Sequence, residues 1–160
     1  MPDVISDTSP LQYLFQTGHL DLLPNLYGTV LVPRAVADEL AVGRALGIPL
    51  PDPNGLPWVQ ICAAKESDLL TLVPDLGSGE RASLALALNT PGSILILDDL
   101  LARRYADFLK LRYTGTLGVL LRAKIAGHIA IIRPVLDELD RLRLRLSGDT
   151  RAAVLRRAGE

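Results

Sequence analysis

Five acidic residues, spread along the chain, are the side chains with the clearest chemical potential. Asp7 and the Asp98–Asp99 pair each follow a short aliphatic run, and Glu39 and Glu80 lie on the inward side of segments with helical periodicity. Carboxylates gathered in one cleft repel each other unless a cation held by their oxygens cancels the charge. A divalent metal ion in such a cluster activates water and stabilises the charge that develops during phosphodiester cleavage. The pattern therefore predicts a metal-dependent phosphodiesterase site whose catalytic and metal-binding candidates are Asp7, Glu39, Glu80 and Asp98, with Asp99 as a further ligand.

Each of these acids also has an ordinary structural explanation. Asp7 can cap the helix that follows it, and Glu39 can be a boundary residue whose carboxylate reaches water. A glutamate in the first turn of a helix, as expected for Glu80, is favoured by the helix dipole. Asp99 is an effective cap for the next helix, which leaves Asp98 as the preferred ligand of the pair. The alternatives stay open for each residue, and the joint placement of the acids favours a site.

Several polar residues near these acids are candidate substrate contacts. Thr8 and Ser9 directly follow the first acid. Thr114 and Thr116 flank a glycine where a helix is expected to begin, so their hydroxyls and the helix N-terminus can face a phosphate. Arg103 follows the acidic pair by one turn and can hold an RNA backbone. The alternatives are simple capping by Thr116 and a solvated surface position for Arg103.

Composition excludes several other kinds of site. The 160 residues include 17 basic and 18 acidic side chains, so any nucleic-acid binding needs a local patch rather than a global field. The single Cys62 excludes an internal disulfide, and one cysteine with two histidines excludes a Cys/His zinc site. Neither a basic-apolar leader nor an apolar stretch of membrane-spanning length is present, so we expect a cytoplasmic protein without a membrane segment.

Short apolar runs alternate with helical patterns along the chain, and this predicts one α/β domain over residues 1–160 with a mostly parallel sheet. Strands are predicted at residues 4–6, 29–32, 58–61, 94–97 and 112–114. Helices are predicted from residue 8 onward and at 19–27, 33–40, 67–72, 80–88, 100–109 and 117–126, with about 130–160 as a helical extension. Residues 43–57 are rich in Gly and Pro and predict a loop, 74–79 predict a turn, and 141–146 fit either a strand or a frayed tail. Ligands of parallel sheets bind beyond the strand carboxyl ends where the strand order reverses, so Asp7 and Asp98 meet if their strands are neighbours.

Four segments in this order resemble the motifs of PIN-domain proteins. They are VISDTSPL at 4–11, VADEL at 36–40, GERA at 79–82 and LDD at 97–99. A fifth segment, TGTLG at 114–118, resembles a prokaryotic branch of PIN-like proteins similar to VapC-type toxins. The resemblance covers nearly the whole chain, from Asp7 to about Gly148, and the order and spacing of the motifs carry it.

The resemblance implies both a fold and an activity. The implied fold is a three-layer α/β/α sandwich with strand order 3-2-1-4-5. The implied activity is Mg²⁺- or Mn²⁺-dependent cleavage of RNA, with the protein as a homodimer held by a small antitoxin. Carried over by position, the acidic set is Asp7, Glu39, Glu80 and either Asp98 or Asp99. Many PIN proteins have Asp where this chain has Glu80, and the longer side chain predicts altered metal geometry and weak activity.

Two other hypotheses remain from the sequence. A catalytically weak or inactive module that keeps this fold would instead bind a small partner protein, with Glu39 and Glu80 as ordinary helix residues. A phosphatase that uses Asp7 as a covalent nucleophile is disfavoured, because such enzymes usually have a second Asp two residues later and this chain has Ser9.

Overall fold

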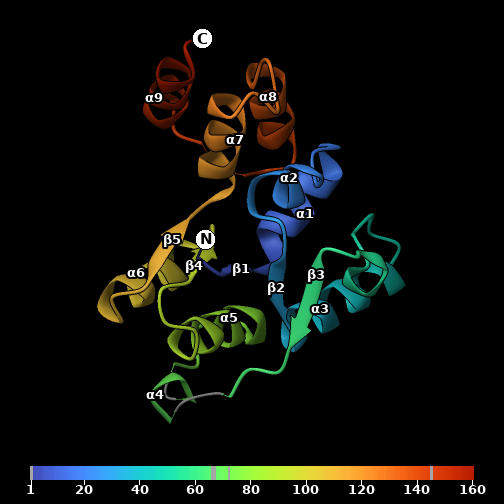
Figure 1. Cartoon of the computed structure of the whole chain (residues 1–160), viewed down its shortest axis with the longest axis vertical. Coiled ribbons are helices and arrows are strands. Elements are labelled where there is room, and N and C mark those ends of the chain that lie inside the picture. Colours follow the sequence, from blue (N-terminus) through green and yellow to red (C-terminus); the bar gives the residue numbers. More distant parts are fainter. Residues whose placement is uncertain (1, 66–67, 72, 145) are drawn as a thin grey trace.

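The centre of the molecule is a sheet of five parallel strands (Figure 1). The computed structural model describes residues 2–65, 68–71, 73–144 and 146–160. Within them the strands lie in the order β3-β2-β1-β4-β5. Their bounds are Val4–Ser6 (β1), Val30–Pro33 (β2), Val59–Cys62 (β3), Ile94–Ile96 (β4) and Arg112–Thr114 (β5). The predicted α/β class and strand order are confirmed.

The strand order reverses beside β1, which lies between β2 and β4. Ser6 at the end of β1 pairs with Ile96 at the end of β4. The chain leaves these two strand ends into Asp7 and, two positions beyond Ile96, into Asp98. The strands that carry the two acids are therefore neighbours, and their carboxyl ends share one edge of the sheet, where parallel α/β sheets bind ligands.

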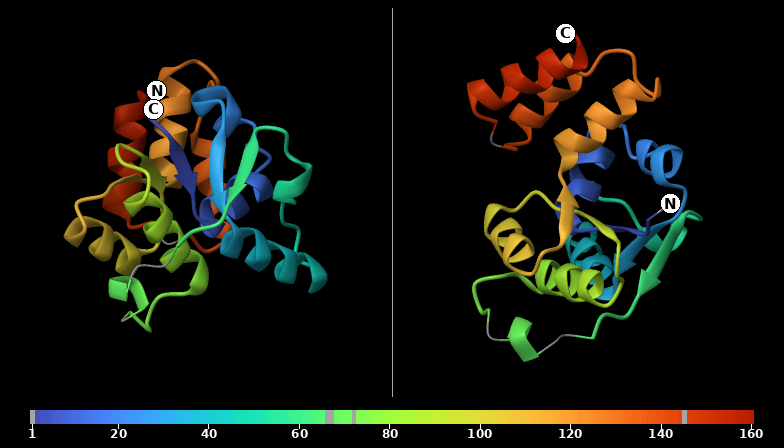
Figure 2. Two further views of the ribbon diagram at one scale, coloured as in Figure 1. Left: turned by 60° about the horizontal axis from the view of Figure 1, so that its bottom comes forward. Right: turned by 60° about the vertical axis from the view of Figure 1, so that its left-hand side comes forward.

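Helices cover both faces of the sheet, as two views of the ribbon show (Figure 2). Val4 and Ile96 contribute to a core with α1, α2, α7, α8 and α9, whereas Ile5 and Leu95 contribute to a core with α5 and α6. The predicted three layers are thus confirmed. None of the helices in the described residues is long and apolar enough to cross a membrane. The helices are α1 (Thr8–Gln16), α2 (Leu22–Tyr27), α3 (Arg34–Ala45), α4 (Asp68–Thr71), α5 (Ser78–Leu88), α6 (Leu100–Phe108), α7 (Thr116–Ile125), α8 (Arg133–Arg141) and α9 (Gly148–Ala158).

The largest difference from the sequence prediction lies at the end of α3. This helix continues to Ala45 instead of ending near residue 40, so it occupies the first part of the loop expected at 43–57. Gly43 lies inside the helix and is buried rather than ending it. An added Cβ at this position would overlap the Leu50 side chain. The rest of the expected loop contains the short 3₁₀ turn Pro53–Gly55.

Other boundaries differ by a few residues. α2 begins at Leu22 rather than at residue 19, and α5 begins at Ser78, inside the turn expected at 74–79. The helix expected at 67–72 is present as α4, and its two predicted end residues lie outside the described residues. Arg141 ends α8, and none of the other described residues between 141 and 146 is in a strand, so the strand alternative is wrong.

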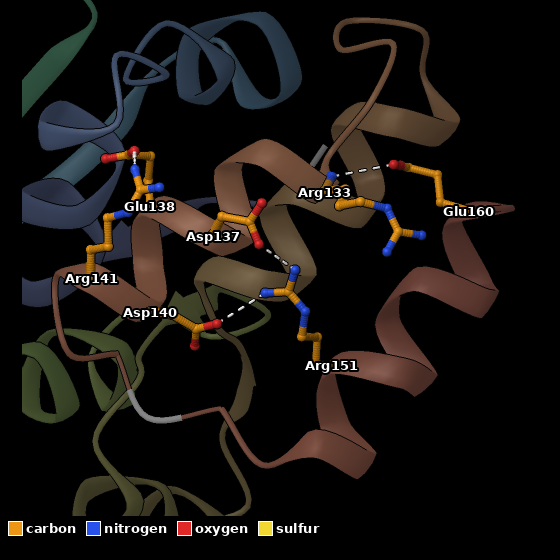
Figure 3. Close-up of polar contacts among 7 residues, drawn as sticks. All are labelled: Arg133, Asp137, Glu138, Asp140, Arg141, Arg151 and Glu160. Atoms are coloured by element: carbon orange, nitrogen blue, oxygen red, sulfur yellow. Dashed lines mark hydrogen bonds and ion pairs between the residues drawn. The ribbon is translucent and has the colours of Figure 1, made fainter.

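The C-terminal helices α8 and α9 are joined by ion pairs (Figure 3). Arg151 of α9 donates to Asp140 of α8 at 2.9 Å and also to Asp137 one turn earlier. Both carboxylates lie on one side of α8, so a single guanidinium fixes how the two helices lie against each other. These contacts position the helices of the segment that the sequence predicts as a helical extension.

The last residue of the chain makes a second connection in the same region (Figure 3). The Glu160 carboxylate accepts hydrogen bonds from the amides of Ile132 at 2.9 Å and Arg133 at 3.2 Å, where α8 begins. Lys124 of α7 donates to the same carboxylate at 3.3 Å. A negative charge at a helix N-terminus is favoured by the helix dipole, so Glu160 ties the end of α9 to both α7 and α8.

Candidate active site

Asp7 is the most deeply buried acid of the candidate site, with 2% of its surface exposed. It occupies the position before α1 but its side chain makes no capping hydrogen bond there, so the capping alternative is not borne out. The hydroxyl of Ser83, on α5, instead donates to Asp7 Oδ1 at 3.1 Å. Burial raises the pKa of the Asp7 carboxyl from 3.8 to about 7, and the nearby carboxylates of Glu80 and Glu39 add to the rise. Asp7 therefore changes its charge close to neutral pH.

Glu39 is held by three donors from two other segments. Thr8 Oγ1 donates to its Oε2 at 2.6 Å, and Ser78 Oγ and the Gly79 amide donate to its Oε1 at 3.1 and 2.8 Å. The last two donors lie in the first turn of α5, where the helix dipole also favours a negative charge. An added Cβ on Gly79 would lie 2.8 Å from Glu39 Oε1, so this close approach requires glycine. Glu39 therefore fixes the N-terminus of α5 against α3 and the start of α1.

Glu80 lies in the first turn of α5 and is half-buried. Burial raises the pKa of its carboxyl, and the neighbouring carboxylates of Glu39 and Asp99 raise it further. A Cβ added at Gly77 would overlap the Glu80 carboxylate, which shows that the side chain folds back over the start of its own helix. The Glu80 side chain, one carbon longer than that of Asp, thus bends back toward Gly77 instead of extending away from the helix.

The two members of the Asp98–Asp99 pair have different surroundings. Asp98 Oδ1 accepts from the Thr116 amide at 2.8 Å, and Oδ2 accepts from the Thr116 hydroxyl at 2.6 Å. Arg103 Nη2 lies 3.9 Å from the same Oδ1. Asp99 is exposed and caps α6, with Oδ2 accepting from the Ala102 amide at 2.8 Å. The predicted cap is confirmed, and the structure shows that Asp98 anchors the start of α7.

Arg103 is a fixed cation in the site rather than a solvated surface side chain. Its Nε donates to the Leu97 carbonyl at 2.8 Å, and its guanidinium lies over the Tyr113 ring, 5.3 Å from the centroid. An added Cβ on Gly115 would overlap the guanidinium and lie 2.8 Å from Asp98 Oδ1. Glycine is therefore needed at position 115 for Arg103 and Asp98 to approach each other.

A groove of about 800 Å³ begins at this cluster and continues to the C-terminal helices. Its acidic end is formed by Glu80, Asp98 and Asp99, beside Arg103. Of the predicted substrate contacts, Ser9, Thr114 and Arg103 line the groove, whereas the hydroxyls of Thr8 and Thr116 donate to Glu39 and Asp98. The far end has an apolar wall and polar edge that the sequence analysis missed: Tyr13, Leu117, Leu121, Leu144, Leu146, Val154, Ser147, Thr150 and Arg157.

Sequence reasoning also missed Ser83, Ser78 and Gly79. Ser83 is fully buried and lies three residues after Glu80 on α5, a helical spacing that puts the two on adjacent positions of one face. A serine at this spacing, in a stretch from Ala82 to Leu88 that is otherwise apolar, is the available signal. Ser78 and Gly79 fall in the turn predicted at 74–79, and the sequence does not show that this turn lies beside Glu39.

Neighbouring carboxylates raise the pKa values of Asp7 and Glu80, but the described acids do not form a preformed metal cage. In the part of the chain that the structure describes, no group of three or more His, Cys, Asp or Glu residues is arranged to hold a metal ion. Asp7, Glu80 and Asp99 have no ion pair with a described basic residue, and Asp98 alone faces Arg103. A group of carboxylate oxygens with uncompensated charge fits a hard divalent cation in chemistry and in charge.

Comparison with known proteins gives one family match. A family model described as DUF3368, PIN domain, matches residues 3–160. No curated protein and no solved structure gives a significant match. The matched range contains all five acids and every residue that lines the groove.

Proposed function

The chain belongs to the DUF3368 family of PIN domains, and we propose that it is a metal-dependent endoribonuclease that hydrolyses RNA phosphodiester bonds at the acidic cluster. PIN domains are generally nucleases. The single observation that carries the proposal is the Asp7 carboxyl, buried beside Glu80 without a described basic partner and with its pKa raised to about 7. A site that concentrates negative charge in this way is expected where a cation binds.

Three of the five acids are the better candidates for holding Mg²⁺ or Mn²⁺. Both oxygens of Glu39 and both of Asp98 already accept hydrogen bonds from the protein. Asp7, Glu80 and Asp99 have more free oxygen, because Asp7 accepts from one hydroxyl and Asp99 uses one oxygen as a cap. The metal ion, when bound, would activate the attacking water and neutralise charge on the phosphate.

The other residues of the site bind and orient. Arg103 presents a guanidinium at the acidic end of the groove, where it can bind a phosphate oxygen by charge-assisted hydrogen bonds. Asp98 orients Arg103 and holds the first turn of α7, and Glu39 holds the first turn of α5. The two helix N-termini therefore border the place where an anionic substrate would lie, and their dipoles favour its charge.

Cleavage of a labelled single-stranded RNA by the purified protein in Mg²⁺ or Mn²⁺ tests this proposal. Asp7→Asn should abolish cleavage, because a neutral amide is a poor metal ligand, while the exposed Asp38→Asn should cleave like the wild type. Asp38 is a suitable control because it neighbours Glu39 in sequence but is exposed, and the pairing with Arg34 that its spacing allows is absent from the ion pairs of the described residues. Equal cleavage by wild type and Asp7→Asn would show that the activity comes from a contaminant.

A second candidate function is binding of a small partner protein by a catalytically weak module. The observation that favours it is the saturation of Glu39 and Asp98 by protein hydrogen bonds, together with the missing three-acid arrangement in the described residues. Titration calorimetry separates the two candidates: the nuclease should bind Mn²⁺, more weakly in Asp99→Asn, and the binding module should not. The antitoxin partner, the homodimer and the toxin role implied by the resemblance stay proposals of the same kind.

A further inference from the structure

A second pocket, of about 230 Å³, adjoins the groove across the edge strand β5. Tyr113 and Thr114 of this strand line both the pocket and the groove. The pocket is further lined by Arg112 at the start of β5 and Arg122 in the last turn of α7, together with Tyr27 and Ile94. A molecule lying along β5 would therefore contact the acidic groove at one end of the strand and this pocket at the other.

The pocket carries two positive charges and no carboxylate among its lining residues. Arg112 and Arg122 are both exposed, and neither takes part in an ion pair or side-chain hydrogen bond among the contacts of the described residues. Burial raises the pKa of the Tyr27 phenol, and the nearby charge of Arg122 lowers it by less. The Tyr27 hydroxyl therefore remains a hydrogen-bond donor at neutral pH. Two free guanidinium groups are well suited to phosphate, which they bind through paired hydrogen bonds.

Strand β5 lies between the pocket and the groove. Arg112 and Thr114 lie two residues apart, about 7 Å along the strand, and their side chains point to the same face. Tyr113, the residue between them in sequence, points to the opposite face, where its ring lies under the Arg103 guanidinium. A nucleic-acid strand carries a negative charge at every nucleotide, so one that enters the groove has further phosphates within reach of Arg112 and Arg122.

We propose that Arg112 and Arg122 form a phosphate-binding subsite for single-stranded RNA, separate from the acidic cluster. This subsite holds the RNA strand beside the bond to be cleaved. This inference rests on the proposed function for the identity of the substrate. The charged groups that line the pocket are the two guanidiniums of Arg112 and Arg122, so the subsite binds the phosphates of the backbone. It therefore contributes affinity and register without base specificity.

Fluorescence anisotropy with a labelled 12-nucleotide oligouridine tests the subsite in EDTA, where no cleavage occurs. The variant is Arg112→Ala/Arg122→Ala, and the matched control is Arg104→Ala/Arg156→Ala, which removes the same charge from two exposed arginines that line neither hollow. The variant should bind about tenfold more weakly, and its log-affinity against log-salt slope should fall by about 1.4, which is about 0.7 for each phosphate that is no longer neutralised. The control should change affinity less than twofold. Equal reductions of affinity in the two double variants would overturn the subsite, since only the overall field would then matter.

A comparison of substrate lengths separates this inference from the proposed function. Cleavage of the 12-mer should fall in the double variant, whereas cleavage of a trinucleotide too short to reach both hollows should not. If wild type does not cleave but binds the 12-mer through both arginines, the nuclease proposal fails and the subsite stands. If wild type cleaves and the double variant binds like the control, the subsite alone fails. Displacement of the 12-mer by polyglutamate at equal charge concentration would also overturn the assignment, because the patch would then bind any polyanion. Circular dichroism of both double variants confirms that they are folded.

Discussion

Replacing Asp7 with Asn should stabilise the metal-free protein at neutral and alkaline pH. Burial and the neighbouring acids raise the pKa of Asp7 from 3.8 to about 7. Below pH 4 the carboxyl is protonated in the folded and the unfolded chain, so its contribution to stability is fully present there. Between about pH 4 and 7 the unfolded chain releases its proton while the folded chain keeps it, and stability falls as pH rises through this window.

The size of this loss follows from the pKa values. One pKa unit corresponds to about 1.4 kcal/mol, so the rise from 3.8 to about 7 corresponds to roughly 4 kcal/mol at pH 8. Asn removes the charge and keeps an oxygen that can accept from the Ser83 hydroxyl. We therefore expect Asp7→Asn to raise the free energy of unfolding by about 2–4 kcal/mol at pH 8, equivalent to roughly 2–4 °C in melting temperature for each kcal/mol in a chain of this size.

Urea denaturation in EDTA at pH 4, 6 and 8 measures the effect. The difference between wild type and Asp7→Asn should grow with pH and nearly vanish at pH 4, while the exposed Asp38→Asn should match wild type throughout. Mn²⁺ at a hundredfold excess over its dissociation constant should stabilise the wild type by about 2.7 kcal/mol and the variant by less. A variant as stable as wild type at pH 8 would refute the argument, because Asp7 would then carry no destabilising charge.

Three further changes have directions that the contacts define. Asp98→Asn should destabilise the protein by about 1–3 kcal/mol in urea denaturation. The Thr116 amide and hydroxyl donate to different oxygens of Asp98, and an amide would put an NH₂ donor in place of one of these acceptors and remove the charge that faces Arg103; a gain in stability would contradict this. Gly79→Ala should push the Glu39 carboxylate from the start of α5 and reduce both melting temperature and RNA cleavage, and unchanged values would show that Glu39 has room to move. Arg151→Ala should lower stability by about 1 kcal/mol or less, with a smaller effect in high salt, since its ion pairs are partly exposed.

Much of the fold could be predicted because its signals are local. Four consecutive aliphatic residues predict β4 as a buried strand, and the acidic pair that follows them predicts a cap for α6, which Asp99 forms. The end of α3 could not be predicted in this way. Glycine is a residue that commonly ends a helix, so Gly43 predicts an end that is not observed. Its burial against Leu50 depends on how a later loop returns across the helix. The strand order came from the resemblance to PIN domains, since nothing in the composition of a strand states its neighbour.

The site was only partly predictable, because its arrangement depends on contacts between distant segments. The sequence identified the acids, and the neighbouring positions of β1 and β4 bring two of them to one sheet edge. Asp98, rather than Asp99, is engaged by contacts with Thr116 and Arg103, and the sequence shows neither contact. Arg112 and Arg122 gave no signal either, since one belongs to a strand and the other to a helix and only the fold places them in one pocket.

The contacts divide four of the five acids into two groups with different tasks. Glu39 and Asp98 accept from helix N-termini and threonine hydroxyls, so their charges are already balanced and they hold α5 and α7 in position. Asp7 and Glu80 have raised pKa values because burial and neighbouring carboxylates outweigh the hydrogen bonds that they accept, and neither has an ion pair among the described residues. A cation that binds the second group must displace a proton from Asp7 near neutral pH, so its affinity should rise as pH increases toward and past 7. Metal binding at this site should therefore depend on pH through Asp7.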